Sequence, residues 1–202
     1  MATTDTRTVD WSYELVDQLA MHWEHQLRPR LDGLTDAEYR WEPVPGCWNL
    51  RPRAEATTAM AAGVGELVLD FERPEPVPAP VTTIAWRLGH LLVGVLGMRN
   101  ANHFGGPAVD YTSARWPATA TEGLTAVDEA YGVWTEGVRS LGDDRLADPI
   151  GPAEGPWQDR SYATLVLHIS REMIHHGAEI ALLRDLYRAT GGAPLGTTAK
   201  AR

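Results

Sequence analysis

The stretch REMIHHGAEI, residues 171–180, holds two histidines and two glutamates that can bind a divalent metal ion. Glu172 and His176 are four residues apart, so on a helix they lie on one face and can both reach the same cation. A third ligand has to come from another helix, and His90 in WRLGHLLVGVLG is the candidate. Three protein ligands with one open position are typical of a catalytic metal centre rather than a structural one.

The helices that must position these residues are visible in the apolar periodicity. Amphipathic helices are predicted over residues 10–34, 82–104, 121–141 and 161–188. In the last of these, apolar side chains recur at steps of three and four, and the stripe includes His176: Leu165, Ile169, Met173, His176, Ile180, Leu183 and Tyr187. His176 should therefore face the core, with Glu172 beside it. A buried carboxylate is costly unless it is paired or bound to a metal.

The same spacing also fits a protein without a metal. A histidine on an apolar face is often a core residue held by hydrogen bonds, and Glu172 could be an exposed residue at the edge of the stripe. His175 points about a quarter-turn away from His176 and is expected at the rim or behind the ligands. Glu179 lies four residues beyond His175 and could pair with it. The helical spacing alone leaves both interpretations open.

Four long amphipathic helices without a convincing strand pattern predict an all-α bundle. A long irregular connection, residues 35–80, separates the first two helices and hints at a cover over a functional site. Within it, Thr35 and Glu38 have the spacing of a capping box, and residues 54–69 are expected to form a short helix. Residues 10–190 are predicted to form the domain, with flexible ends at residues 1–9 and 191–202.

Composition narrows the class of protein. The 202 residues suit one domain, and the net charge of −9 disfavours nucleic acid as a partner. No stretch approaches the roughly 20 apolar residues of a membrane span, and the N-terminus carries no apolar signal core, so a cytoplasmic protein is expected. The single Cys47 excludes an internal disulfide and a multi-cysteine metal site, and its Pro/Gly loop offers no neighbouring base.

The order of these parts resembles the DinB-like superfamily, which includes thiol-dependent S-transferases and the mycothiol-dependent maleylpyruvate isomerase. The resemblance spans about residues 10–188 and rests on three segments: LTDAEYRWEPVPGCWNL, TTIAWRLGHLLVGV and REMIHHGAEIALLRDLY. It implies a four-helix bundle that binds zinc or nickel through three ligands, which by motif are His90, Glu172 and His176. Many members have histidine where this chain has Glu172, and the mycothiol-dependent branch is closer because it uses a His, Glu, His set.

The resemblance implies a small-molecule enzyme with a thiol cosubstrate such as mycothiol, acting as an S-transferase or isomerase on a small electrophile, and a homodimer. Side chains that could line its pocket are Trp48, Trp86, Tyr131 and Trp134, with Arg87 and His103 as candidates for binding anionic groups of a substrate. Core packing explains each aromatic residue equally well. Two other functions stay open: a metal-dependent hydrolase using Glu179 or His175 as base, and a non-catalytic bundle that binds a small ligand or dimerises.

Overall fold

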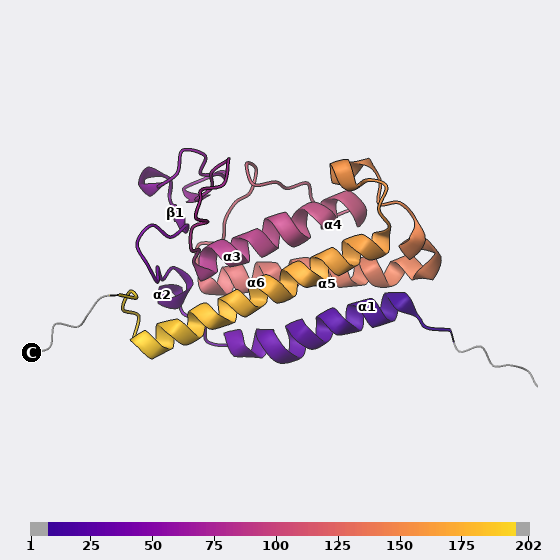
Figure 1. Cartoon of the computed structure of the whole chain (residues 1–202), viewed down its shortest axis with the longest axis horizontal. Helices are drawn as coiled ribbons and strands as arrows, with labels where there is room; N and C mark the ends of the chain where they lie inside the picture. Colours follow the sequence, from indigo (N-terminus) through magenta and orange to yellow (C-terminus); the bar gives the residue numbers. More distant parts are fainter. Residues whose placement is uncertain (1–7, 197–202) are drawn as a thin grey trace, which may run out of the picture.

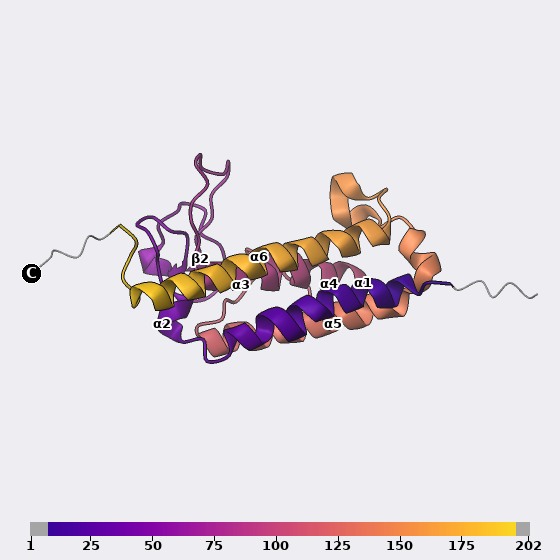
Figure 2. The ribbon, with the colours of Figure 1, turned by 60° about the horizontal axis from the view of Figure 1, so that its bottom comes forward.

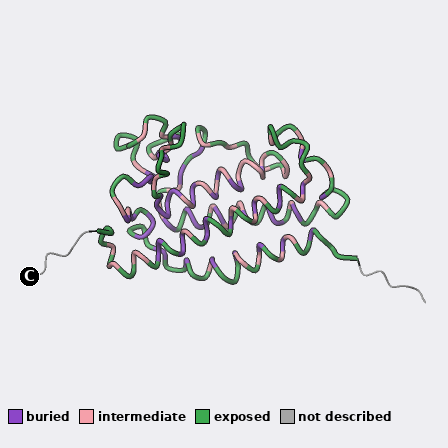
Figure 3. The backbone as a smooth tube through the Cα atoms, in the orientation of Figure 1, coloured by how far each residue is buried: buried purple, intermediate pink, exposed green. Residues whose placement is uncertain are grey.

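The computed structural model describes residues 8–196 and shows a bundle of four long helical rods with two loop regions at its ends (Figure 1). The second rod and α5 run in one direction and the first rod and α6 in the opposite direction, and the apolar stripes of all four meet in one core (Figure 1). Along each rod, buried residues alternate with exposed ones, as expected for helices that turn one face toward a shared core (Figure 3). The predicted all-α bundle is confirmed.

The first rod consists of α1 (Trp11–Ala20), the π-helical segment η1 (Met21–Leu27) and the 3-10 turn η2 (Arg28–Leu31). Asp10 caps it as predicted, because its carboxylate accepts a hydrogen bond from the backbone N–H of Tyr13 at 2.9 Å.

Trp11 stands four residues before Leu15 and eight before Leu19, in step with the apolar stripe of this rod, but its side chain is exposed. An α-helix has 3.6 residues per turn, so a step of four drifts around its axis, whereas the wider π-helix keeps that step on one face. Leu19, Trp23 and Leu27, which follow the step of four into η1, are accordingly buried.

The second rod runs through α3 (Ile84–His90), the π-helical η4 (Leu91–Gly97) and α4 (Met98–His103). Thr83 begins it by accepting a hydrogen bond from the backbone N–H of Trp86. The π-helical segment starts directly after His90, and such segments are frequent at functional sites.

The third rod is α5 (Ala120–Ala147), which continues beyond the predicted end through a break at Gly142, where φ is 68°. The fourth is α6 (Tyr162–Thr190), which is capped by Ser161 at its start and ends at the left-handed Gly191. The stripe positions predicted for α6 are buried except the half-buried Tyr187. In α5 the buried apolar residues larger than alanine are Leu124, Val127, Tyr131, Trp134, Val138 and Leu146.

The long connection (residues 35–80) contains α2 (Asp36–Tyr39) with the predicted capping box of Thr35 and Glu38. The helix predicted over residues 54–69 is wrong. In its place lie the 3-10 turn η3 (Arg53–Glu55) and an antiparallel pair of strands, β1 (Leu50–Pro52) and β2 (Leu67–Leu69).

The buried carboxylate of Asp70 explains why this segment is not helical. It accepts hydrogen bonds from the backbone N–H groups of Asn49 and Thr57, both at 3.1 Å, and from Arg51 Nε at 2.8 Å. These bonds tie together segments that a helix would keep apart. Gly63, with φ of 130°, adds a backbone conformation that a helix does not contain.

A second loop, residues 148–161, joins α5 to α6 and contains the 3-10 helix η5 (Pro152–Trp157); it is called the η5 loop below. The long connection and the η5 loop rise from the same side of the bundle, one at each end (Figure 2). Between them the second rod and α6 lie side by side, and this is the part of the surface where His90 and the REMIHHGAEI stretch meet.

Residues 1–7 and 197–202, which belong to the predicted flexible ends, lie outside the described residues. Residues 191–196 are described and contact the domain: the carbonyl of Gly192 accepts a hydrogen bond from Trp41 Nε1 at 2.9 Å, and the N–H of Leu195 donates to the carbonyl of Pro43 at 2.7 Å. Within residues 8–196, no helix is long and apolar enough to cross a membrane.

Candidate metal centre

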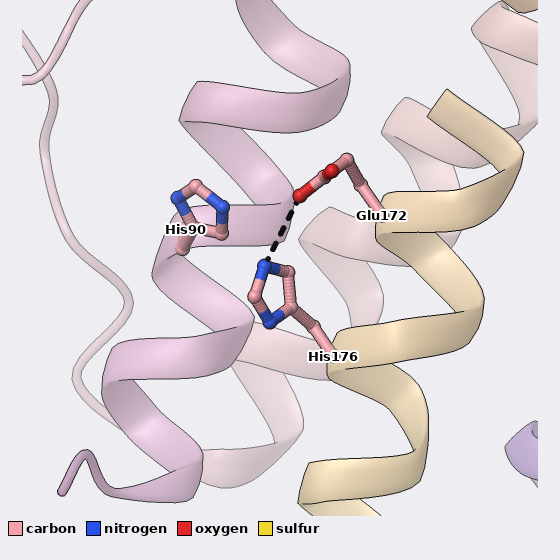
Figure 4. A group of neighbouring side chains, drawn as sticks. All are labelled: His90, Glu172 and His176. Carbon is pink, nitrogen blue, oxygen red and sulfur yellow. Dashed lines mark ion pairs between the residues drawn. The ribbon is translucent and has the colours of Figure 1, made fainter. Parts of the chain in front are cut away.

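His90, Glu172 and His176 converge from two neighbouring rods (Figure 4). His90 is the last residue of α3, and the other two lie one turn apart in the middle of α6. One donor atom from each of the three lies within 4.8 Å of the others, and His176 Nε2 is 3.3 Å from Glu172 Oε2. The spacing predicted from the sequence thus brings the three side chains together.

The separation of donor atoms suits a shared cation. Two donors, each about 2.1 Å from a zinc ion at a tetrahedral angle, lie about 3.4 Å apart. The His176–Glu172 separation of 3.3 Å is close to this value. Two imidazoles and one carboxylate are also a donor set that zinc and nickel accept. The residues present therefore fit a divalent ion.

His90 is held by a ring contact and by a hydrogen bond at one nitrogen. Its ring stacks on Trp86 with centroids 5.5 Å apart, and its Nδ1 lies 2.6 Å from the hydroxyl of Tyr111. Burial, with smaller contributions from the nearby His176 and Arg87, lowers the pKa of His90 to about 3. The imidazole is therefore neutral at physiological pH, and with Nδ1 engaged, Nε2 is the nitrogen left to bind a metal.

His176 is oriented in the same way by a different partner. Its Nδ1 lies 2.7 Å from Glu179 Oε2 and 3.1 Å from Arg87 Nη1, and because a carboxylate can only accept, the shorter contact with Glu179 favours the tautomer with the proton on Nδ1. Its Nε2 then has a lone pair that can bind a metal ion, and this nitrogen faces Glu172. Arg87 Nε forms an ion pair with the same Glu179 oxygen at 3.1 Å. Burial lowers the pKa of Arg87, against the opposing effect of Glu179. Hydrogen-bonded partners of this kind fix the tautomer of metal-binding histidines.

Of the other predicted residues, His175 and two tryptophans lie near the centre. The side chain of His175 is exposed, and its Nε2 is 3.4 Å from Glu179 Oε1. Trp86 contacts His90 directly, whereas Trp48 packs against the far side of Trp86, with ring centroids 5.9 Å apart.

Tyr131 and Trp134 are not brought to the centre. The hydroxyl of Tyr131 donates to Glu24 Oε1 at 2.9 Å, between α5 and the first rod. Trp134 is buried against Phe104, with ring centroids 5.4 Å apart.

His103 lies at the end of the bundle that carries the η5 loop. Its Nε2 is 3.1 Å from Glu154 Oε1, and its Nδ1 is 3.2 Å from the hydroxyl of Tyr162. Tyr162 precedes Glu172 by ten residues of α6, or about 15 Å of helix. His103 therefore fastens the η5 loop to α4 and is remote from the three candidate ligands.

Two residues near the centre were missed in the sequence. His168 Nδ1 lies 3.5 Å from Glu172 Oε1, and its position four residues before Glu172 is a spacing that could have revealed it. Tyr111 comes from the loop between α4 and α5, where no local pattern marks it. Its one signal is Gly94, where an added Cβ would lie 2.2 Å from the Tyr111 hydroxyl.

Cys47 is not part of a reactive site. Its side chain is buried, and its thiol donates to the carbonyl of Val44 at 2.9 Å. Burial raises the pKa of the Cys47 thiol, which disfavours the nucleophilic thiolate.

Comparison with known proteins identifies the family of this chain. The family model of the DinB superfamily matches residues 18–180, a range that includes all three candidate ligands. No curated protein and no solved structure matches the chain. Members of this superfamily are typically metal-binding helical proteins, as the cluster of two histidines and a glutamate leads one to expect. Because the match covers most of the sequence, this chain belongs to the DinB superfamily.

Proposed function

We propose that this protein is a divalent-metal-dependent enzyme that activates a low-molecular-weight thiol for reaction with a small electrophile. His90, Glu172 and His176 would hold the ion, with zinc favoured and nickel as the alternative. The observation that carries the proposal is that both histidines are held in the same way. Each has its Nδ1 engaged by a fixed oxygen, which leaves both Nε2 atoms to the space they share with Glu172.

A divalent cation at this position supplies a Lewis acid that lowers the pKa of a thiol or a water molecule. With the cation bound, the charges around the centre would favour binding of an anion. Glu172 and Glu179 each carry a negative charge and Arg87 a positive one, so the three together carry about one negative charge, which a dication more than offsets. The centre would then be positive and would favour a thiolate over a neutral thiol.

The chain's own residues divide the remaining tasks. Glu179 holds the Nδ1 proton of His176, and Arg87 holds Glu179 in turn. His175 is exposed at the rim and lies within reach of Glu179, so it can pass the proton of the incoming thiol to solvent. A cosubstrate of the mycothiol type is proposed because the His, Glu, His set resembles that branch of the superfamily.

The first test is the metal content of untagged protein, measured by mass spectrometry. We expect about one zinc or nickel ion per chain in the wild type, and loss of the ion in His176→Ala. His175→Ala is the matched control, since it removes the neighbouring exposed imidazole and should keep the metal. If neither zinc nor nickel binds after incubation, the proposal is wrong.

A second assay separates thiol transfer from hydrolysis. Metal-loaded protein is given a small α,β-unsaturated acid with and without mycothiol, glutathione or cysteine, and both reactants are followed. Loss of the electrophile only when a thiol is present supports thiol transfer. Hydrolysis of ester or amide substrates without a thiol would support the hydrolase instead, and binding without turnover would indicate a non-catalytic protein.

A further inference from the structure

A cavity of about 460 Å³ opens beside the candidate metal centre, between the η5 loop and the first half of α6. Its volume is in the range of sites that bind small molecules. Part of its wall is apolar and comes from both elements: Ile150, Trp157, Leu165 and Leu167. Trp157 and Leu167 are large apolar side chains that remain exposed, so this wall has no partner within residues 8–196 that covers it.

The cavity and the candidate ligands share two neighbours. His168 lines the cavity, and its Nδ1 lies 3.5 Å from Glu172 Oε1. Arg99 also lines the cavity, and its Nη1 donates to the carbonyl of Gly94, one turn beyond His90, at 2.8 Å. A molecule in the cavity would therefore have one end next to Glu172.

The charge of the cavity wall is opposite to that of the whole chain, which carries a net charge of −9. Three arginines line it against one carboxylate, Glu154, and that carboxylate is already engaged by Arg99 Nη2 at 3.2 Å. Arg160 is exposed, and its side chain makes no hydrogen bond or ion pair within the described part of the chain. Arg171 is also exposed, with Nη2 at 2.6 Å from His168 Nδ1 and 3.8 Å from Glu172 Oε1. The guanidinium of Arg160 is thus free to pair with an anion, and the exposed guanidinium of Arg171 has N–H groups left for a second contact.

We propose that this cavity is the substrate site, and that it takes an organic anion with an apolar body. A carboxylate would pair with Arg160 and Arg171, and the apolar part would lie against Trp157 and Leu167. Because Arg171 Nη2 lies 3.8 Å from Glu172 Oε1, the carboxylate end of the molecule would lie nearest the candidate metal centre. This inference rests on the proposed function for the identity of the reaction, but the recognition of an anion in this cavity can be tested without any turnover.

The test measures binding by calorimetry with two probes of equal shape, 3-phenylpropionate and its neutral amide, 3-phenylpropanamide. Both are titrated into zinc-loaded protein and into protein treated with a chelator. We expect the acid to bind in both preparations, and about tenfold more tightly than the amide. Arg160→Gln should weaken binding of the acid about threefold to fivefold and leave binding of the amide unchanged. Arg139→Gln is the matched control, because Arg139 is exposed on α5 and forms no side-chain hydrogen bond or ion pair within residues 8–196.

Three results would overturn the inference. They are equal binding of acid and amide, unchanged binding of the acid to Arg160→Gln, and loss of acid binding in the chelated protein, which would place the carboxylate at the metal instead of the cavity. Failure of the proposed function has a different signature. Metal or thiol-dependent turnover would then be absent while the chelated protein still preferred the acid over the amide.

Discussion

Replacing Tyr111 with phenylalanine removes one oxygen atom from the support of His90 and should weaken metal binding. For His90 to bind an ion through Nε2, its Nδ1 must carry the proton, and the acceptor of that proton is the Tyr111 hydroxyl at 2.6 Å. Burial raises the pKa of Tyr111 to about 12, so the residue is a neutral phenol at physiological pH. The ring itself stacks on Phe71, with centroids 5.9 Å apart, and this contact survives in the variant.

The size of the effect follows from the lost acceptor. A buried N–H left without a partner costs about 1 to 3 kcal/mol. Only the metal-bound form requires the proton on Nδ1, because the free imidazole can place it on Nε2 and avoid most of this cost. The penalty therefore falls on metal binding, and we expect the dissociation constant of zinc to rise about 10- to 100-fold in Tyr111→Phe.

The assay is a competition titration of zinc against a chromogenic chelator. Tyr131→Phe is the matched control, because it removes the same atom from a tyrosine whose hydroxyl bonds to Glu24 between α5 and the first rod. The control should bind zinc as the wild type does. If the affinity of Tyr111→Phe stays within about twofold of the wild type, the hydroxyl does not set the tautomer of His90 and our account of the centre is refuted. An equal loss in both variants would indicate a general effect on the bundle.

Three further changes test other parts of the structure. In Gly94→Ala the new Cβ would lie 2.2 Å from the Tyr111 hydroxyl, so zinc affinity in the same titration should fall about tenfold despite the better helix propensity of alanine. Glu38 and Arg184 form a buried ion pair at 3.1 Å, so Glu38→Gln should lower the free energy of unfolding in urea by about 3 kcal/mol at neutral pH. Burial would raise the pKa of Glu38, but hydrogen bonds from Thr35 and Arg184 outweigh this effect and lower the pKa. The folded state therefore binds fewer protons than the unfolded state at this carboxyl group. The stability difference between wild type and Glu38→Gln should then narrow as the pH falls below about 4.5, the pKa of Glu38 in the unfolded chain. Cys47 should react with a disulfide reagent about 100-fold more slowly in the folded protein than in urea.

Controls for these changes are available in the same chain. An added Cβ at Gly132 meets nothing within 4 Å, so Gly132→Ala should leave zinc binding unchanged. Unchanged zinc binding in Gly94→Ala as well would show that the Tyr111 hydroxyl is free to move. A deficit of Glu38→Gln that stays constant from neutral to acidic pH would show that its charge is not what stabilises the fold. Rapid reaction of the folded protein would show that Cys47 is accessible.

The four rods were predictable because each is specified by local patterns that tertiary packing does not override. Asp10, Thr83 and Ser161 begin helices with the side-chain hydrogen bonds that their residue types predict. The proximity of His90 to Glu172 and His176 was also predictable from the apolar stripes. Once His176 belongs to the apolar stripe of one helix and His90 lies near that of another, packing the stripes together brings the two rings within 4.7 Å.

The rest depends on contacts between segments far apart in the sequence. The strands of the long connection are held by Asp70, whose partners lie up to 21 residues away, and no periodicity reveals such a contact. Tyr111 reaches His90 from a loop across 21 residues for the same reason. His103 has the residue type expected of an anion-binding group, but Glu154 of the η5 loop engages it at the end of the bundle.

This division between helices and loops bears on how the protein would select its substrate. The three candidate ligands stand on helices, where the packing of the bundle fixes them and leaves little freedom to vary. Some of the residues around them come from loops instead: Tyr111 supports His90, and Arg160 and Trp157 line the adjacent cavity. Loops tolerate substitution better than packed helices do. A change in the η5 loop could therefore alter the cavity while His90, Glu172 and His176 remain in place. The chemistry of the centre would then be set by the bundle, and the choice of substrate by the loop above it.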